Sequence, residues 1–334
     1  MQSPGDHSEQ APPDLDQTRS IAGFWRRLLA FIVDWLILGA GGYVSGLFLF
    51  EFYVHLGLWG RLFGFAVALA YFGIFNSSAG GGRTVGKRIF RIEVVDKEGS
   101  HISILRSMIR YSVLGVPFSL NLLLMPARVG QSLFGYLMGI LVLTLLGAIV
   151  YLYIFNRRSR QSLHDLVAGT YVVRRHPEGP VAAPPLWKPH LIVLTTWLAV
   201  VSAYMVFLAP MFLGGAFLAE IVPVQRTIES LEDVHVAAVM VGKRTAMPPG
   251  GTRVTSYVEA TVTLKQRPED RDKAAMRVAA VVLETYARIA QMDFLAVTVR
   301  YGFDIGIASS WRGQTVQFSL EEWRYILQPD QEAG

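Results

Sequence analysis

Long runs of apolar residues alternate with short polar stretches over the first two-thirds of the chain. A helix that crosses a bilayer needs about 20 mainly apolar residues. Five runs come close to this length or exceed it, and the first is interrupted only by Asp34. The pattern therefore predicts five membrane-spanning helices, over residues 28–50, 58–75, 112–127, 133–155 and 191–219.

Two of these runs are unusual. The run 112–127 is short and contains Pro117 and Asn121, so it either crosses the membrane or turns back as a re-entrant segment. The run 191–219 is longer than a bilayer requires, so we expect it to tilt or to leave the membrane as a helix. Between the second and third runs, residues 88–104 predict a short hairpin or an amphipathic segment on the membrane face.

The pattern changes after Pro223. Apolar residues alternate along 254–264, which is typical of a half-buried strand, and 234–241 is its expected partner. Residues 269–291 have helical spacing, and Ser319 with Glu322 forms a capping box that begins a last helix. Further strands are predicted over 294–300, 303–310 and 315–318.

The predicted fold class is an α-helical membrane bundle of about five transmembrane helices, followed by a small soluble α+β domain. The predicted parts are a disordered cytoplasmic tail (1–20), a membrane domain with four transmembrane helices (21–175), a linker with the fifth helix (176–222) and an extracytoplasmic domain (223–334).

Composition supports the membrane assignment. Of the 334 residues 17% are charged, against about 25% in soluble proteins. The chain has no cysteine, which excludes disulfides, thiolate nucleophiles and thiolate metal sites. No other pattern points to a metal, a cofactor or a catalytic set, so we expect a protein that is not an enzyme.

Basic residues predict the orientation. Eighteen of the 31 Lys and Arg precede residue 220, and 16 of these lie before the first run, between the second and third, or between the fourth and fifth. Arg61 and Arg128 occupy the other connections. Positive loops stay in the cytoplasm. We therefore expect a plasma (inner) membrane protein with a cytoplasmic N-terminus and, after five spans, an extracytoplasmic C-terminal domain. If the third run is re-entrant, the C-terminal domain is expected in the cytoplasm instead. The basic charge suits lipid headgroups rather than nucleic acid.

The stretch GGGRTVGKR contains Gly-x-x-x-x-Gly-Lys, as in a phosphate-binding loop. Arg88 stands where that loop needs a hydroxyl, and a membrane helix precedes it instead of a core strand. The pattern favours a helix end and a cytoplasmic loop over a nucleotide site.

Asp34 needs a partner, because an ionised carboxylate inside the bilayer costs about 2.5 kcal/mol or more. We expect Asp34 to meet Arg160, His164 or Lys87 from the loops, directly or through water. Asp165 is placed to meet Arg27 at the membrane boundary.

Three stretches carry a resemblance: GFWRRLLAFIVDWLIL, GRTVGKRIFRIEVVDKEG and RQSLHDLVAGTYVV. They resemble the signatures of the RDD family of bacterial membrane proteins over about residues 20–175. The Arg and two Asp of the family's name fall on Arg27, Asp34 and Asp165, and its glycine stretch falls on Gly82 to Lys87. The resemblance implies a transport module, with cation/proton exchange proposed for some members, and gives no substrate.

Two functions remain open. In the first, the chain is a small transporter in which Asp34 binds a proton or a cation. The candidate site also contains Arg27 and Asp165. The supporting residues on the cytoplasmic face are Gly86, Lys87, Arg160 and His164. In the second, the bundle anchors the outer domain, which binds an extracytoplasmic protein. A water-lined cavity at Asp34 would favour transport, and a closed, dry pair would favour an anchor. Gly-x-x-x-Gly pairs at Gly42, Gly60 and Gly135 predict close helix packing, within the chain or in a homo-oligomer.

Overall fold

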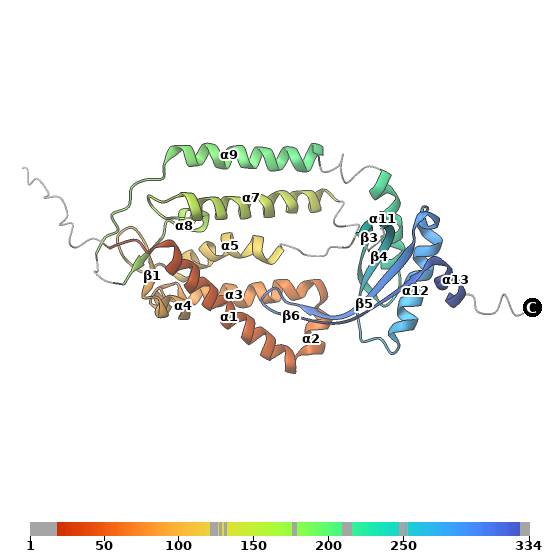
Figure 1. Cartoon of the computed structure of the whole chain (residues 1–334). Coiled ribbons are helices and arrows are strands. Elements are labelled where there is room, and N and C mark those ends of the chain that lie inside the picture. The colour runs from red at the N-terminus through yellow and green to blue at the C-terminus, as the bar shows by residue number, and fades with distance from the viewer. Residues whose placement is uncertain are drawn as a thin grey trace, which may run out of the picture. The chain divides into compact units, whose positions relative to one another are not determined.

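The computed structural model describes residues 19–120, 126, 129, 132–175, 179–208, 216–246, 251 and 253–327 (Figure 1). The predicted disorder of 1–20 falls outside these residues, except at Arg19 and Ser20. The chain forms two compact units. The first comprises the chain up to Leu36, Ala68–Leu114 and Gly147–Leu194; the second comprises Ile37–Val67, Gly115–Leu146 and Thr195–Gly334.

Four of the described helices are long and apolar enough to cross a membrane, judged by length and composition. They are α1 (Phe24–Phe48); α2 (Phe50–Leu56) with α3 (Gly60–Phe75), joined by a 3₁₀ turn; α7 (Leu133–Phe155); and α9 (Lys188–Ala203), prolonged to Leu208 as a π-helix. The predicted spans 28–50, 58–75 and 133–155 thus correspond to long helices, and the last has the predicted bounds.

The third predicted span is covered only in part. Helix α5 (Ile104–Leu120) begins before it and contains Pro117, whereas residues 121–125 lie outside the described part of the chain. Residues 209–215 of the fifth run also lie outside the described part of the chain. Helix α11 (Ala216–Glu229) contains Pro223, where the sequence predicts a domain boundary. The crossing at α5 and the bounds of the four predicted parts stay predictions.

A two-stranded ribbon organises the first unit. Strand β1 (Ile92–Val95) pairs antiparallel with β2 (Tyr171–Arg174), from Ile92 opposite Arg174 to Val95 opposite Tyr171. The hairpin expected within 88–104 is therefore wrong, because β1 takes its partner from a segment almost 80 residues later. Two short helices, α4 (Val85–Ile89) and α8 (Leu163–Ala168), precede these strands. The ribbon's apolar residues form a small core with α1: Ala22, Ala30, Ile92, Val94, Ile102 and Val172.

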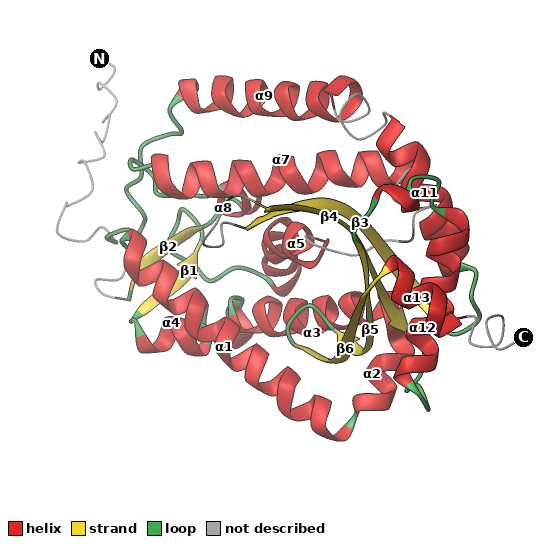
Figure 2. Cartoon of the chain, turned by 45° about the vertical axis from the view of Figure 1, so that its right-hand side comes forward, coloured by secondary structure: helices red, strands yellow, loops and turns green. Residues whose placement is uncertain are grey.

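The C-terminal part of the second unit is an α+β domain. Its sheet has the order β3-β4-β5-β6, formed by Val234–Ala246, Arg253–Leu264, Phe294–Asp304 and Ser309–Ser319. Strands β4 and β5 are parallel, and helix α12 (Arg271–Thr285) connects them. Helices α11, α12 and α13 (Leu320–Leu327) share one apolar core with the sheet. Figure 2 shows the three helices beside the strands. The predicted class, a helical membrane bundle followed by an α+β domain, is confirmed.

Three predicted strands after residue 293 are in fact two longer ones. The predicted turn at Trp311–Gly313 lies inside β6, where Tyr301 pairs with Arg312. The chain turns instead at 305–308. Gly302 makes this pairing possible, because a Cβ there would lie 2.0 Å from the carbonyl oxygen of Ser310. The capping box is confirmed, since Glu322 accepts hydrogen bonds from the backbone N–H and hydroxyl of Ser319.

The tip of the β5–β6 hairpin, residues 303–308, lies against glycines of α1 and α3 within the second unit. A Cβ on Gly64 would lie 1.7 Å from the carbonyl oxygen of Ile305, and one on Gly42 would lie 2.9 Å from the Cβ of Ala308. Gly46 and Gly60 make similar approaches to Phe303 and Asp304. The sequence predicted that these glycine pairs pack against another helix. They pack against the hairpin tip instead, because a Cβ on these glycines would overlap it.

Candidate functional site

Asp34 lies on α1 and is fully buried in the first unit. Its Oδ1 accepts hydrogen bonds from the hydroxyl of Tyr71 and from the backbone N–H of Gly86, both at 2.8 Å. Its Oδ2 accepts a hydrogen bond from the hydroxyl of Thr84 at 2.5 Å. Both carboxylate oxygens are therefore satisfied by neutral donors, one of them a backbone amide at the start of α4.

The stretch from Gly82 to Lys87 builds this arrangement. Thr84 is the N-cap of α4, and its hydroxyl accepts from the N–H of Lys87 while it donates to Asp34. Gly86 is needed for space, because a Cβ there would lie 2.0 Å from the carbonyl oxygen of Ala30 on α1. Gly82 adopts a positive φ of 68° in the preceding turn. The motif docks the short helix α4 onto α1, which accounts for its glycines without a nucleotide.

The direct bonds expected for Asp34 are therefore wrong: among the described contacts, Arg160, His164 and Lys87 do not bond to its carboxylate. Contact through water stays a prediction. Arg160 and His164 belong to the neighbouring Asp165 cluster, and for Lys87 the charge of Asp34 raises the pKa of the ammonium group. The expectation failed because a buried carboxylate can be satisfied by hydroxyl and backbone donors, which a sequence does not display as charges do.

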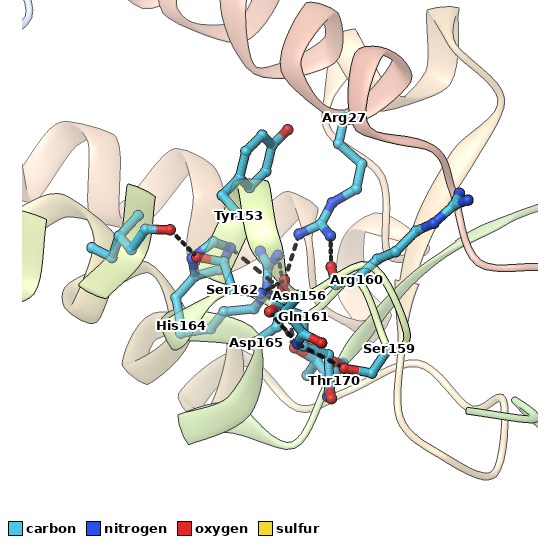
Figure 3. Close-up of polar contacts among 12 residues, drawn as sticks. Arg27, Tyr153, Asn156, Ser159, Arg160, Gln161, Ser162, His164, Asp165 and Thr170 are labelled. Atoms are coloured by element: carbon cyan, nitrogen blue, oxygen red, sulfur yellow. Dashed lines mark hydrogen bonds and ion pairs between the residues drawn. The ribbon is translucent and has the colours of Figure 1, made fainter. Parts of the chain in front are cut away.

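Asp165, in α8, is the centre of a second cluster and is also fully buried. The guanidinium of Arg27 donates to its Oδ2, and Nη2 of Arg110 donates to its Oδ1 at 2.6 Å. The backbone N–H of Ser162, the N-cap of α8, also donates to Oδ2 at 3.2 Å. Figure 3 shows Arg27 reaching down from α1 into this group. The predicted pairing of Arg27 with Asp165 is confirmed.

Arg160 contributes through its backbone. Its carbonyl oxygen accepts a hydrogen bond from Nη1 of Arg27, as Figure 3 shows, while its own side chain reaches the carbonyl oxygen of Ile21 at 3.4 Å. Its φ is 51°, in the left-handed region, which costs an ordinary residue about 1–2 kcal/mol. The bond from Arg27 and the bond from the N–H of Arg160 to Asn156 hold it in this conformation.

The ionisation of the buried groups follows from these contacts. Burial by itself would raise the pKa of Asp165, but His164, Arg27 and Arg110 lower it below its ordinary value. Burial lowers the pKa of His164 to about 3, so its imidazole is neutral at pH 7. Burial, and then the charge of Arg110, lower the pKa of Lys87 to about 7, although Asp34 and Asp165 oppose the shift.

Several contributors lie outside the predicted site. Tyr71, Thr84 and Arg110 bind the two aspartates, and the ring of Tyr153 lies 5.2 Å from the guanidinium carbon of Arg27. The sequence offers a signal for Arg110, because a basic residue two positions before the apolar run from Ser112 needs a counter-charge. Thr84 is visible as an N-cap before the helix VGKRI. Nothing in the sequence singles out Tyr71 among the aromatic residues of α3.

The described residues contain no group of three or more His, Cys, Asp and Glu side chains placed to hold a metal ion. The cluster instead joins three cations, Arg27, Lys87 and Arg110, with two carboxylates in a buried place. Such a group can fix the packing of the segments that carry it, or hold and release a proton.

The apolar helices and the buried charge cluster define a multi-pass membrane protein. The RDD family model matches residues 21–169, which include both aspartates. Over 156 residues the chain is 30% identical to the uncharacterized protein YckC of Bacillus subtilis (strain 168), a match that covers 47% of this chain and 86% of that protein. The chain belongs to the RDD family. No solved structure matches it.

Proposed function

We propose that this chain is a membrane-anchored interaction protein, in which the helical bundle holds the α+β domain at the extracytoplasmic face. In this role the two aspartates fix the packing of the loops, and the domain binds a protein partner outside the cell membrane. The proposal assigns no catalytic role and no cofactor to the chain. Its other partners are membrane lipids, and a homo-oligomer is compatible with it.

The observation that carries the proposal is the closed environment of Asp34. Its carboxylate is fully buried and both oxygens accept hydrogen bonds from protein groups. An ion-binding carboxylate in a transporter needs access to water and an oxygen that can be released to the ion. Tyr71, Thr84 and Gly86 fill these places at Asp34, so a structural role is favoured.

The proposed orientation, with the N-terminus in the cytoplasm of an inner membrane, rests on the basic loops. It also requires five crossings. The third crossing is assigned to α5, a helix of 17 residues that ends in the apolar stretch from Ser112.

Transport of a proton or a cation is the second candidate, and Lys87 is the observation that favours it. This lysine is buried, it is influenced by Asp34, Asp165 and Arg110, and its pKa of about 7 lets it change charge near neutral pH. A buried group with these properties is a candidate for proton transfer.

Flux measurements separate the two candidates. Purified wild-type protein, Asp34→Asn and Lys87→Met are reconstituted into liposomes with a pH-sensitive dye, and an imposed gradient of H⁺, Na⁺ or K⁺ is followed. We expect wild-type vesicles to leak no faster than protein-free vesicles. If the wild type shows a flux that Asp34→Asn abolishes, the chain is a transporter and the anchor proposal is wrong. The thermal transition of each reconstituted protein is the control for folding.

A further inference from the structure

A cavity of about 160 Å³ lies in the second unit, where the sheet meets the start of α3. Strands β3 to β6 and the segment 54–61 all contribute to its wall. It is smaller than the pockets of about 300–1,000 Å³ that enclose drug-sized molecules. It is nevertheless several times the volume of about 30 Å³ that one water occupies. The size suits a small polyatomic group.

The wall of this cavity carries an excess of positive charge. Three cationic side chains line it, Arg61, Lys265 and Arg300, against the single carboxylate of Asp304. That carboxylate is already engaged by Arg61, whose Nη2 and Nε lie 2.7 Å and 3.1 Å from its Oδ2. Arg300 and Lys265 make no ion pair among the described contacts, so one carboxylate stands against three cations in this wall.

Arg300 is held in a fixed orientation. Its Nε donates to the hydroxyl of Thr263 at 2.8 Å, and its guanidinium carbon lies 4.5 Å from the ring centre of Trp311. Among the described residues, no acceptor is found for its two terminal nitrogens. A guanidinium fixed through Nε presents these nitrogens as a planar fork, which matches the paired oxygens of a phosphate or a carboxylate.

Two further donors belong to the same wall. Nε2 of His235 accepts a hydrogen bond from the backbone N–H of Leu58 at 3.2 Å, which places the imidazole proton on Nδ1. Burial lowers the pKa of His235, so the ring stays neutral and Nδ1–H is a donor. Lys265 donates one hydrogen bond, to the carbonyl oxygen of Glu232 at 2.6 Å, and its ammonium has two more N–H groups.

We propose that this cavity is a binding site for a phosphate-type oxyanion, supplied either as free phosphate or as the headgroup of an anionic phospholipid. The fork of Arg300 binds two oxygens, and Lys265 and His235 bind the others. The inference goes beyond the proposed function. It holds whichever side of the membrane the domain occupies and whether or not the bundle transports ions.

The test uses the full-length protein in a neutral detergent. Binding of inorganic phosphate is measured by calorimetry, and binding of a short-chain phosphatidylglycerol, with the matched phosphatidylcholine, by native mass spectrometry. The variants are Arg300→Gln and Lys265→Gln. Arg277→Gln is the matched control, because Arg277 is an exposed arginine of the same domain that pairs with Asp233 away from the cavity.

Wild type and Arg277→Gln should bind with equal affinity, and Arg300→Gln at least about tenfold more weakly, as expected for the loss of a charged hydrogen-bond pair. Lys265→Gln should also weaken binding, and it removes a solvent-exposed side chain, so its effect does not depend on the integrity of the sheet. Binding of phosphate alone identifies a soluble anion, and binding of phosphatidylglycerol alone identifies a lipid headgroup. No binding of either probe, or equal binding by all four proteins, overturns the proposal. Transport and orientation are tested by other experiments, so failure of the anion-site proposal is distinguishable from failure of the proposed function.

Discussion

Asp34 and Asp165 are both buried carboxylates, but their partners differ in kind. Asp34 accepts from two hydroxyls and an amide, whereas Asp165 accepts from two guanidiniums. Neutral donors leave no buried charge behind when the carboxylate is removed. Paired arginines do, and an uncompensated buried charge is the more costly defect. The two aspartates should therefore respond differently to the same substitution.

Asp165→Asn leaves Arg27 and Arg110 buried without their counter-charge, and we expect it to lower the free energy of unfolding by about 3–5 kcal/mol. Asp34→Asn keeps an acceptor for one or two of its three donors, and should cost about 1–3 kcal/mol. Unfolding in detergent, followed by circular dichroism, measures both. Glu98→Gln, in an exposed turn, is the control. Equal losses for the two aspartates would contradict the distinction.

Lys87 should make stability depend on pH. Its pKa is about 7 in the folded protein against 10.5 ordinarily, so between these values the unfolded chain binds more protons. The free energy of unfolding then rises as the pH increases from 7 toward 10. His164 acts in the same direction but between about pH 3 and 6.5, outside this window.

The measurement compares apparent Tm at pH 7, 8 and 9 for wild type, Lys87→Met and Lys97→Met, the last at an exposed position. We expect Lys87→Met to flatten the rise and Lys97→Met to leave it unchanged. If the apparent Tm of Lys87→Met still rises between pH 7 and 9, another titrating group causes the rise.

At the scale of single residues, the sequence predicted the charges better than their partners. The pairing of Arg27 with Asp165 followed from opposite charges at one membrane boundary. The partners of Asp34 did not, because the decisive donor is the backbone amide of Gly86. Its position depends on how closely α4 approaches α1, and that approach depends on the missing Cβ of Gly86 itself.

At the scale of elements, the contact between the hairpin tip and the helix glycines is the clearest case of a motif with an unexpected partner. Gly64 cannot carry a Cβ beside Ile305, whereas a Cβ on Gly41 would meet nothing within 4 Å. The two positions lie on helices of the same unit, and Gly64 is buried whereas Gly41 is exposed.

Gly64→Ala should displace the hairpin tip and cost about 3 kcal/mol, near the upper end of the usual range for overpacking. Gly41→Ala should cause no loss, because alanine is the better helix former. Thermal unfolding followed by tryptophan fluorescence, with limited proteolysis of the β5–β6 hairpin, reports both effects. Wild-type stability and proteolysis in Gly64→Ala would show that the hairpin does not depend on this glycine.

The elements themselves were predicted unevenly. Long helices followed from continuous apolar runs, and α7 has the predicted bounds. Strand β1 was found, but its pairing with β2 was missed, because local pattern carries no information about a partner so distant in the chain. The predicted turn at Trp311–Gly313 failed for a related reason: a glycine in a strand is a site of close backbone approach as often as a turn.

At the scale of the whole molecule, the arrangement across the membrane depends on whether α5 crosses it. The absence of cysteine makes this easy to test. Glu98→Cys and Glu284→Cys each place one thiol at an exposed position, in the turn after β1 and on α12. A membrane-impermeant maleimide applied to intact spheroplasts should label Glu284→Cys and should label Glu98→Cys only after permeabilisation. Protection of both thiols would place the C-terminal domain in the cytoplasm and make α5 re-entrant.

The fold class was within reach of the sequence because hydropathy and the change of pattern near Pro223 are properties of the chain alone. The division into two compact units was not, since each unit collects three separate segments. That division is created by contacts between segments, which single-sequence patterns do not record.

Helix α1 carries Asp34 and Gly46 on one uninterrupted rod, twelve residues or about 18 Å apart. The hairpin tip touches the rod at Gly46, and Tyr71, Thr84 and Gly86 grip it at Asp34. The same helix is therefore fixed in two different ways: by hydrogen bonds to its carboxylate at Asp34, and by close packing of a side chain against bare backbone at Gly46.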